Sequence, residues 1–320
     1  MLRRLLVLVV GIGLAAGAAC LAAPAAGRPG TRIAAGVAVY GVPLGGFSSE
    51  PARTLLRRAL ERPVVLTVDG AERRVQPETM GLRASVDDAV AAALAADGPR
   101  AFGAGATADS ARIRRYVARL DRTLSRRPRD AELVGLDRVR PRFAPAAPGR
   151  RVDRRRLAAA IAHALASGDR DPIAIRFRPV APKVTARTFG PVVVIGRYAN
   201  RLFLYDGPRL AASFPVATGQ SRYPTPLGTF KIADLQRNPW WYPPPSDWAK
   251  GLKPVPPGPG NPLGTRWMGL DVYGVGIHGT PDAASLGYSA SHGCIRMAIP
   301  SAEWLFERVR VGTPVVIAAA

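Results

Sequence analysis

The stretch PVVVIGRYANRLFLYDGPRLAASFPVATG, residues 191–219, decides the fold of the C-terminal part of this 320-residue chain. Its runs VVVI, LFLY and AASFPVATG are rich in β-branched and aromatic residues, and Gly, Pro and Asn separate them. This pattern is typical of short strands joined by turns. GTFKI at 228–232, a strand over 270–277 and the terminal TPVVIA continue it, with one short helix at 301–309. We therefore expect a mostly antiparallel β domain over residues 188–320.

A proline-rich insertion interrupts this β pattern. Residues 238–264, NPWWYPPPSDWAKGLKPVPPGPGNPLG, contain too much Pro and Gly for a regular element. So long an irregular segment is usually a functional loop. Its aromatic residues either line a substrate groove or pack the loop down, and we expect packing for most of Trp240, Trp241, Tyr242 and Trp248.

Two segments upstream of the β domain resemble each other, residues 66–95 and 133–166. Each has a short β-like stretch, then a Pro and a Gly, then Val-Asp opening an Ala- and Leu-rich helical pattern. Asp87 and Asp153 suit an N-cap or first-turn position. We interpret the pair as a duplicated α+β unit. Residues 31–187 are thus predicted to form two small α+β modules, at about 31–120 and 121–187.

The N-terminus has the layout of a secretory signal. MLRR supplies positive charge, and an uncharged apolar run follows from Leu5 to Ala26. Residues 1–30 are therefore predicted to be a signal peptide or an uncleaved anchor, which places the body outside the cytoplasm. GAAC around Cys20 resembles a lipoprotein signal, but Gly17 stands where that signal has a branched aliphatic residue. Outside the cytoplasm cysteines tend to pair, yet the mature part offers Cys294 no partner.

The charge of the chain is strongly positive, with 45 Lys and Arg against 23 Asp and Glu. Such a balance attracts anionic partners, here an acidic cell-wall polymer, a membrane face or nucleic acid. It can equally reflect an Arg-rich proteome. The sequence has no zinc-finger spacing, ribonucleoprotein motif or basic stripe with aromatic residues, which argues against nucleic acid. We expect membrane contact only through the N-terminal segment.

The stretch GIHGTPDAASLGYSASHGCIRM, residues 276–297, concentrates rare reactive side chains. It holds His278, His292 and Cys294, from a chain with three His and two Cys. A thiol becomes a useful nucleophile as thiolate, and a neighbouring imidazole can take its proton. His292 lies two residues before the cysteine, where a productive contact is awkward. His278 ends a predicted strand and can approach from across a turn, so we prefer it as the base.

Two glycines flank these residues, Gly279 and Gly293, and allow close approach of backbone and substrate. The N–H groups of Gly293 and Cys294 are candidates for an oxyanion hole. Two other interpretations stay open for the same residues. One is a metal site built from both histidines and the cysteine, and the other is a buried structural cysteine. We expect neither, and we expect no metal and no cofactor. The third histidine, His163, lies in a helical pattern and has no expected chemical role.

IHGT followed by SASHGCIRM resembles the signature of the L,D-transpeptidase (YkuD-type) catalytic domain. ATGQSRYPTPLGTFKI, with Gly219 and the segment 225–230, resembles a second conserved segment of that family. Together the likeness covers about residues 189–320. Through PLGGFSSEPA at residues 43–52 and the two helices opened by Gly and then Val-Asp, the N-terminal half is similar to peptidoglycan-binding modules found ahead of such domains.

The resemblance implies a role for each matching residue. Cys294 would be the nucleophile, and His278 the general base and later acid, oriented by the carbonyl of Gly279. The oxyanion and substrate-binding region would comprise Ser291, His292, Gly293 and Arg296. The family often has an Asn and an Asp shortly after the arginine, where this chain has Ile299 and Ser301. This difference affects how the start of the following helix is stabilised and leaves the residues of the reaction unchanged.

The function implied is a two-step acyl transfer on peptidoglycan stem peptides, forming 3→3 cross-links outside the cytoplasm. Anionic wall polymers are a further expected partner of the basic N-terminal half. Two alternatives remain: an L,D-carboxypeptidase that trims stem peptides, and a catalytically inactive wall-binding protein. A third, a sortase-like protein anchor, is disfavoured because SHGCIRM does not match the sequence pattern around a sortase cysteine.

Overall fold

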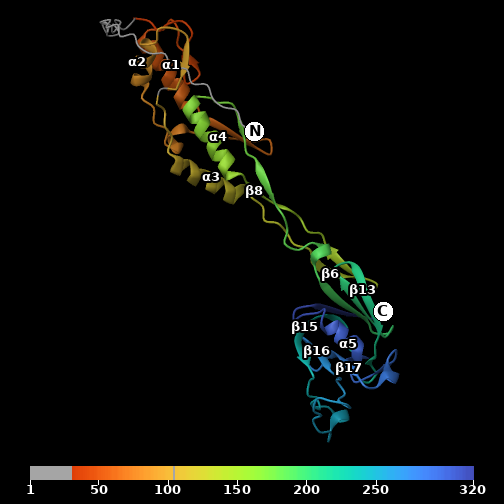
Figure 1. Ribbon diagram of the computed structural model, residues 1–320. Coiled ribbons are helices and arrows are strands. Elements are labelled where there is room, and N and C mark those ends of the chain that lie inside the picture. Colours follow the sequence, from red (N-terminus) through yellow and green to blue (C-terminus); the bar gives the residue numbers. More distant parts are fainter. Residues whose placement is uncertain (1–30, 104) are drawn as a thin grey trace, which may run out of the picture. The chain divides into compact units, whose positions relative to one another are not determined.

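The computed structural model of the chain describes residues 31–103 and 105–320 (Figure 1). The predicted signal or anchor at residues 1–30 lies outside them. The described chain forms two compact units. Unit 1 comprises the residues up to Arg119 together with Arg154–Arg176, and unit 2 comprises Leu120–Asp153 and Phe177–Ala320. Within the described ranges, no helix is both long and apolar enough to cross a membrane.

Unit 1 is an α+β unit in which helices pack on short sheets. In α1 the residues Ala52, Leu56 and Leu60 recur on one helical face and are buried. They pack with α2, whose Ala89 and Val90 are buried in the same core. The elements are β1 (Val37–Val39), β2 (Val42–Pro43), α1 (Ser49–Glu61), β3 (Val64–Val68), β4 (Ala71–Val75), η1 (Pro77–Met80), α2 (Val86–Leu94), β5 (Arg100–Phe102), α3 (Ser110–Leu124, which continues into unit 2), α4 (Arg154–Ser167) and β9 (Ile173–Ala174).

This division differs from the predicted modules at 31–120 and 121–187. Both predicted repeats do contain a hairpin followed by a helix, β3–β4 before α2 and β6–β7 before α4. However, α4 contacts β3 and β9 of unit 1, whereas the β6–β7 hairpin contacts β11 of unit 2. The physical reason is that helix α4 and the β6–β7 hairpin bury their apolar side chains in different cores. Leu157 and Ile161 of α4 are buried. Phe143 of β7 packs on Val192 and Val194 of β11.

Unit 2 is built on one eight-stranded mixed sheet, which confirms the predicted mostly-β class of the C-terminal domain. The strand order is β13-β12-β11-β20-β15-β16-β17-β19. Neighbours are antiparallel except for the parallel pairs β11–β20 and β17–β19. Ala217, just after the edge strand β13, exchanges two backbone hydrogen bonds of 2.9 Å with Arg296 of the other edge strand β19. The sheet is therefore nearly closed and barrel-like.

The elements of unit 2 are β6 (Glu132–Asp137), β7 (Arg140–Ala144), β8 (Gly149–Val152), β10 (Phe177–Val180), η2 (Ala186–Thr188), β11 (Pro191–Gly196), β12 (Arg201–Asp206), β13 (Arg209–Pro215), β14 (Thr218–Gly219), β15 (Gly228–Arg237), η3 (Asp247–Ala249), β16 (Arg266–Leu270), β17 (Gly276–Thr280), η4 (Ala283–Ser285), β18 (Ser289–Ser291), β19 (Ile295–Ala298), α5 (Ile299–Phe306) and β20 (Pro314–Ala318). The inner face of the sheet and α5 share one core, in which Ile195, Leu202, Ile277, Ile295 and Leu305 are buried.

The strand predicted over 270–277 and the helix predicted over 301–309 were wrong in their bounds. The single strand expected over 270–277 is the end of β16, a turn at Gly274 and the start of β17. Gly274 has φ 72°, a left-handed conformation that lets the chain reverse there. The helix expected at 301–309 is α5, which begins at Ile299 with no side-chain cap and ends at Phe306.

Candidate active site

Two parallel strands, β17 and β19, bring the two motif halves together. In their register His278 pairs with Arg296, and Ile277 pairs with Ile295. Side chains of an extended chain alternate between faces. Cys294, two residues before Arg296, therefore lies on the same face as His278. The parallel pairing thus joins residues that the intervening segment, including η4 and β18, separates in sequence.

The imidazole of His278 is almost fully buried, with 4% exposed. Its Nδ1 lies 2.7 Å from the carbonyl oxygen of Gly279. Because a carbonyl only accepts, Nδ1 carries the proton and Nε2 is left as an acceptor. Burial lowers the pKa of His278 to about 4; the bond to Gly279 opposes the shift, and the charge of Arg296 adds to it. His278 is therefore neutral near pH 7, in the tautomer that a base acting through Nε2 requires.

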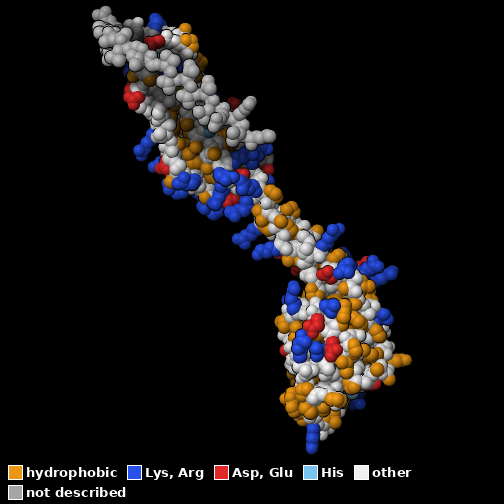
Figure 2. All heavy atoms as spheres, in the orientation of Figure 1, with side chains coloured by type: hydrophobic (Ala, Val, Ile, Leu, Met, Phe, Trp, Pro, Cys, Tyr) orange, Lys and Arg blue, Asp and Glu red, His pale blue; other side chains and the backbone are white. Residues whose placement is uncertain are grey.

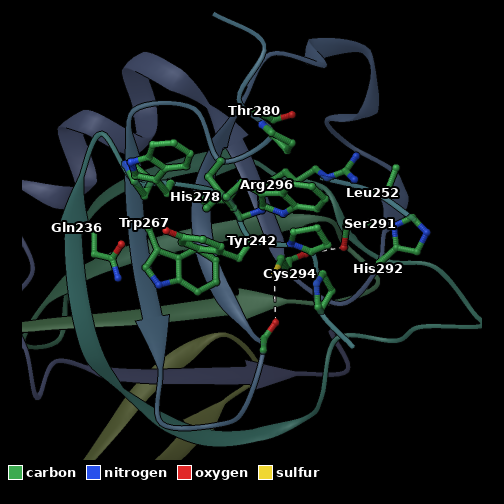
Figure 3. A pocket seen from close by; sticks show the side chains of 18 of the residues that line it. Gln236, Tyr242, Leu252, Trp267, His278, Thr280, Ser291, His292, Cys294 and Arg296 are labelled. Atoms are coloured by element: carbon green, nitrogen blue, oxygen red, sulfur yellow. Dashed lines mark hydrogen bonds between the residues drawn. The ribbon is translucent and has the colours of Figure 1, made fainter. Parts of the chain in front are cut away.

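The thiol of Cys294 is partly exposed and free. Its Sγ donates a hydrogen bond to the carbonyl oxygen of Gly274 at 3.4 Å (Figure 3). Burial raises the pKa of Cys294, while a backbone hydrogen bond with Gly276 and the charge of Arg296 oppose that shift. The resting group is thus a thiol turned toward the β16–β17 turn, and no hydrogen bond joins it to His278 among the described residues.

A hydrogen-bonded loop presents the cysteine. The buried Ser291 donates from Oγ to the carbonyl oxygen of Cys294 at 2.5 Å and accepts from the N–H of Gly293 at 3.1 Å. Gly293 has φ 114°, a region that favours glycine. The N–H of Gly293, a predicted oxyanion donor, is therefore already engaged within the loop, and Ser291 supports the loop from inside.

His292 points away from that network and is exposed. Its ring stacks on Trp248 of the 238–264 loop, with centroids 4.0 Å apart and 15° between the planes. Tyr223 lies against its ring at 5.1 Å between centroids. Burial and the charge of Arg296 lower the pKa of His292. His292 thus links the cysteine loop to the proline-rich insertion.

Arg296 supplies the positive charge of the site. Its guanidinium is partly buried and lies 3.6 Å from the carboxylate of Asp282. The same charge lowers the pKa values of His278, His292 and Cys294. Removing it would favour a protonated imidazole and an un-ionised thiol.

All these side chains line one cavity of about 1300 Å³. His278, Cys294 and Arg296 share it with the insertion, as Figure 3 shows in part. The aromatic residues that we expected mostly to pack the loop all line the cavity: Trp240, Trp241, Tyr242 and Trp248. The described residues contain no group of three His, Cys, Asp or Glu side chains arranged to hold a metal ion.

The family model of the L,D-transpeptidase catalytic domain (YkuD) matches residues 190–317. YqjB of Bacillus subtilis, named as an L,D-transpeptidase, is 35% identical over 133 residues, 40% of this chain and 70% of that protein. The chain belongs to the L,D-transpeptidase family. It spans about half of YkuD of the same organism, with 35% identity over 99 residues, 31% of this chain and 48% of that protein.

A cysteine-to-serine mutant of the Enterococcus faecium L,D-transpeptidase aligns over 83% of this chain and 98% of its own, at 16% identity and a TM-score of 0.36.

Within this L,D-transpeptidase, one buried residue was not singled out from the sequence. Thr225 has none of its surface exposed; its Oγ1 accepts from the N–H of Gly219 at 2.8 Å and donates to the carbonyl of Gly293 at 2.9 Å. A Cβ on Gly219 would collide with the carbonyl of Tyr223. Thr225 therefore ties the second family segment to the cysteine loop. The only sequence signal was its place in TPLGTF.

Proposed function

We propose that this chain is an extracytoplasmic L,D-transpeptidase that joins peptidoglycan stem peptides by 3→3 cross-links through a cysteine acyl-enzyme. The observation that carries the proposal is the placement of Cys294 and a neutral, Nδ1-protonated His278 on one face of β17 and β19, within one large cavity. Family membership supports the reaction class.

The first half-reaction begins when the thiol turns from Gly274 toward Nε2 of His278. His278 takes the proton as Sγ forms a bond to the carbonyl carbon of the third stem residue, and the carbonyl electron pair moves to oxygen. Collapse of that intermediate breaks the C–N bond to the terminal D-alanine, whose amine takes the proton from His278. A thioester on Cys294 remains.

The second half-reaction runs the same steps in reverse with a new amine. The side-chain amine of a neighbouring stem attacks the thioester and passes a proton to His278. The C–S bond then breaks, and the sulfur recovers that proton. No step needs a metal or an organic cofactor.

We assign the remaining site residues as follows. The N–H of Cys294 is the oxyanion donor, since the N–H of Gly293 serves Ser291 in the resting loop. Arg296 binds a carboxylate of the donor stem peptide. That carboxylate replaces Asp282, whose contact with the guanidinium is 3.6 Å long and thus longer than a charged hydrogen bond. Losing one oxyanion donor costs about 3–4 kcal/mol of barrier in comparable enzymes.

The test is the intact mass of the protein after exposure to ertapenem, the drug whose adduct is named for the solved catalytic domain of the Enterococcus faecium enzyme. We expect one adduct in the parent, none in Cys294→Ser and much slower formation in His278→Ala. His163→Ala, at an exposed helix position, is the matched control and should react like the parent. A folded parent with a free thiol and no adduct would contradict the proposal.

Product analysis separates transfer from trimming. With disaccharide-tetrapeptide as the only substrate, mass spectrometry should show cross-linked dimers. Tripeptide alone would indicate a carboxypeptidase that uses the same residues, with water in place of the amine.

We also propose that the N-terminal segment directs the protein out of the cytoplasm and that the basic N-terminal half binds the wall. The support is the signal-like pattern of residues 1–30 and the excess of Lys and Arg. Binding of the purified protein to isolated cell walls should weaken steeply as salt rises. Binding to isolated cell walls that does not change with salt concentration would contradict the proposed electrostatic attraction.

A further inference from the structure

The segment around Trp241 is extended, which sorts its aromatic side chains onto two faces. Trp241 and Val255 exchange two backbone hydrogen bonds of 2.9 Å each. Because side chains alternate along an extended chain, Trp240 and Tyr242 share one face and Trp241 takes the other. Trp241 turns toward Trp248, at 6.5 Å between ring centroids.

Trp240 and Tyr242 form a stacked pair of exposed aromatic rings, here called the aromatic shelf. Their ring centroids are 6.2 Å apart and the planes differ by 23°. Trp240 is 50% exposed and Tyr242 is 67% exposed. Figure 2 shows hydrophobic side chains gathered over the loop between β15 and β16, to which both belong. Large apolar side chains exposed side by side indicate a binding surface.

The loop does not need the shelf to hold its own shape. The buried Asn261 donates from Nδ2 to the carbonyls of Pro239 at 2.9 Å and Pro256 at 3.0 Å. Its Oδ1 accepts from the N–H of Leu263 at 2.8 Å. This polar centre and the Trp241–Val255 pairing fix the segment from inside. The two outward rings are thus available to a ligand.

The shelf is continuous with the reacting residues. Trp240 and Tyr242 line the same cavity as Cys294 and His278, and its volume is about 1300 Å³. Ordinary small-molecule sites measure about 300–1,000 Å³. The scissile peptide occupies the part next to Cys294, so a larger substrate group attached to that peptide can fill the rest.

A pyranose ring matches the chemistry of the shelf. The C–H face of a sugar is apolar and carries weak positive charge, which suits the negative face of an aromatic ring. Its hydroxyl and acetamido groups need donors and acceptors at the rim. Gln236 and Asn238, which precede Trp240 in the chain, also line the cavity. Nε2 of Gln236 donates to Oδ2 of Asp234 at 2.6 Å, so its Oε1 is left as an acceptor, and the side-chain amide of Asn238 can supply both a donor and an acceptor.

We propose that the aromatic shelf binds the N-acetylated sugars to which the stem peptide is attached, so that the enzyme reads glycan and peptide together. This inference rests on the proposed function for the identity of the substrate. It makes the shelf a determinant of specificity for a reaction whose chemistry lies at Cys294.

The test compares substrates with and without the sugar in the full protein and in the double variant W240A/Y242A. The parent should use disaccharide-tetrapeptide with a KM at least about tenfold below that for the free tetrapeptide. The double variant should lose this preference and keep the parental KM for free tetrapeptide. Tyr288→Ala, at an aromatic position that is as exposed as Tyr242 but does not line the cavity, is the control and should keep the preference.

A binding measurement is independent of turnover. Calorimetric titration of Cys294→Ser protein with the disaccharide alone should show binding that W240A/Y242A weakens at least about tenfold, while Trp240→Phe with Tyr242→Phe retains most of it. Equal affinity in parent and double variant, or no binding at all, would overturn the inference. Disaccharide binding by a protein that forms no ertapenem adduct would contradict the proposed cysteine chemistry but would still support a sugar site at the aromatic shelf.

Sedimentation velocity supplies the remaining outcome. A parent that self-associates, and a double variant that is monomeric with no change in disaccharide affinity, would show that the shelf is a contact between copies and would overturn the sugar site.

Discussion

The imidazole of His292 lies flat on the indole of Trp248, 4.0 Å between centroids and 15° between planes. One ring belongs to the cysteine loop and the other to the proline-rich insertion, so this stack is a direct physical link between the loop that carries Cys294 and the cavity wall. Aromatic pairs contribute about 0.5–1.5 kcal/mol beyond the area they bury. We therefore expect this contact to help hold the insertion against the cysteine loop.

Trp248→Ala should slow ertapenem acylation of Cys294 about two- to tenfold, because the insertion loses its hold on the cysteine loop. The melting temperature should change little, since Trp248 lies outside the main core. Stopped-flow fluorescence or timed intact mass gives the rate. Trp248→Phe keeps a ring face for His292 and should recover most of the rate; an unchanged rate in the alanine variant would refute the link.

Local patterns were enough to predict much of the catalytic unit. The runs VVVI and LFLY correspond to β11 and β12, and TPVVIA to β20, because each alternates or buries β-branched residues between turn residues. The strand GTFKI was predicted too short. β15 continues to Arg237 through residues that are mostly exposed, and its partner β16 pairs with them from beyond the insertion. Pairing between strands that a long insertion separates leaves no signal in the local sequence.

Prediction of the candidate active site was limited in the same way by contacts between distant parts of the chain. The rarity of His and Cys pointed to His278 and Cys294, and the structure places them on one face. The partner of the thiol, Gly274, could not be predicted, because it depends on where the β16–β17 turn falls. The outward faces of Trp240 and Tyr242 depend on pairing with Val255, which is likewise non-local.

Thr225→Val should destabilise the protein and slow acylation together. The substitution keeps the shape but removes the hydroxyl, leaving the buried N–H of Gly219 and the carbonyl of Gly293 without this partner. Each such loss costs about 1–3 kcal/mol. Urea unfolding and ertapenem kinetics measure both effects. Thr225→Ser should be nearly parental in rate, and Thr229→Val, at an exposed position of β15, should be neutral. Parental stability in Thr225→Val would contradict the structural role.

Arg296→Gln should raise the pKa values of both Cys294 and His278, since the charge of Arg296 lowers both. The pH dependence of alkylation by iodoacetamide reports the thiol, and its midpoint should move to higher pH. Arg308→Gln, which removes an arginine that lies over Trp304 on α5, is the control and should leave the midpoint in place. A midpoint that moves down, or not at all, in Arg296→Gln would show that its charge does not act on the thiol.

Stability should fall in acid because of His278. Its pKa is about 4 in the folded protein against an ordinary value of 6.5. Between those values the unfolded chain binds a proton that the folded one does not, so the free energy of unfolding rises with pH across this window. The contribution is complete above about pH 6.5 and is lost as the pH falls to about 4, amounting to about 3 kcal/mol. Urea unfolding at pH 4.5, 5.5 and 7 measures it. His278→Gln should remove most of the slope, although His292, whose pKa is also lowered, adds a smaller term of the same sign. His163→Ala, a change at an exposed histidine of α4, should keep the parental slope, and a His278→Gln protein with that same slope would place its origin elsewhere.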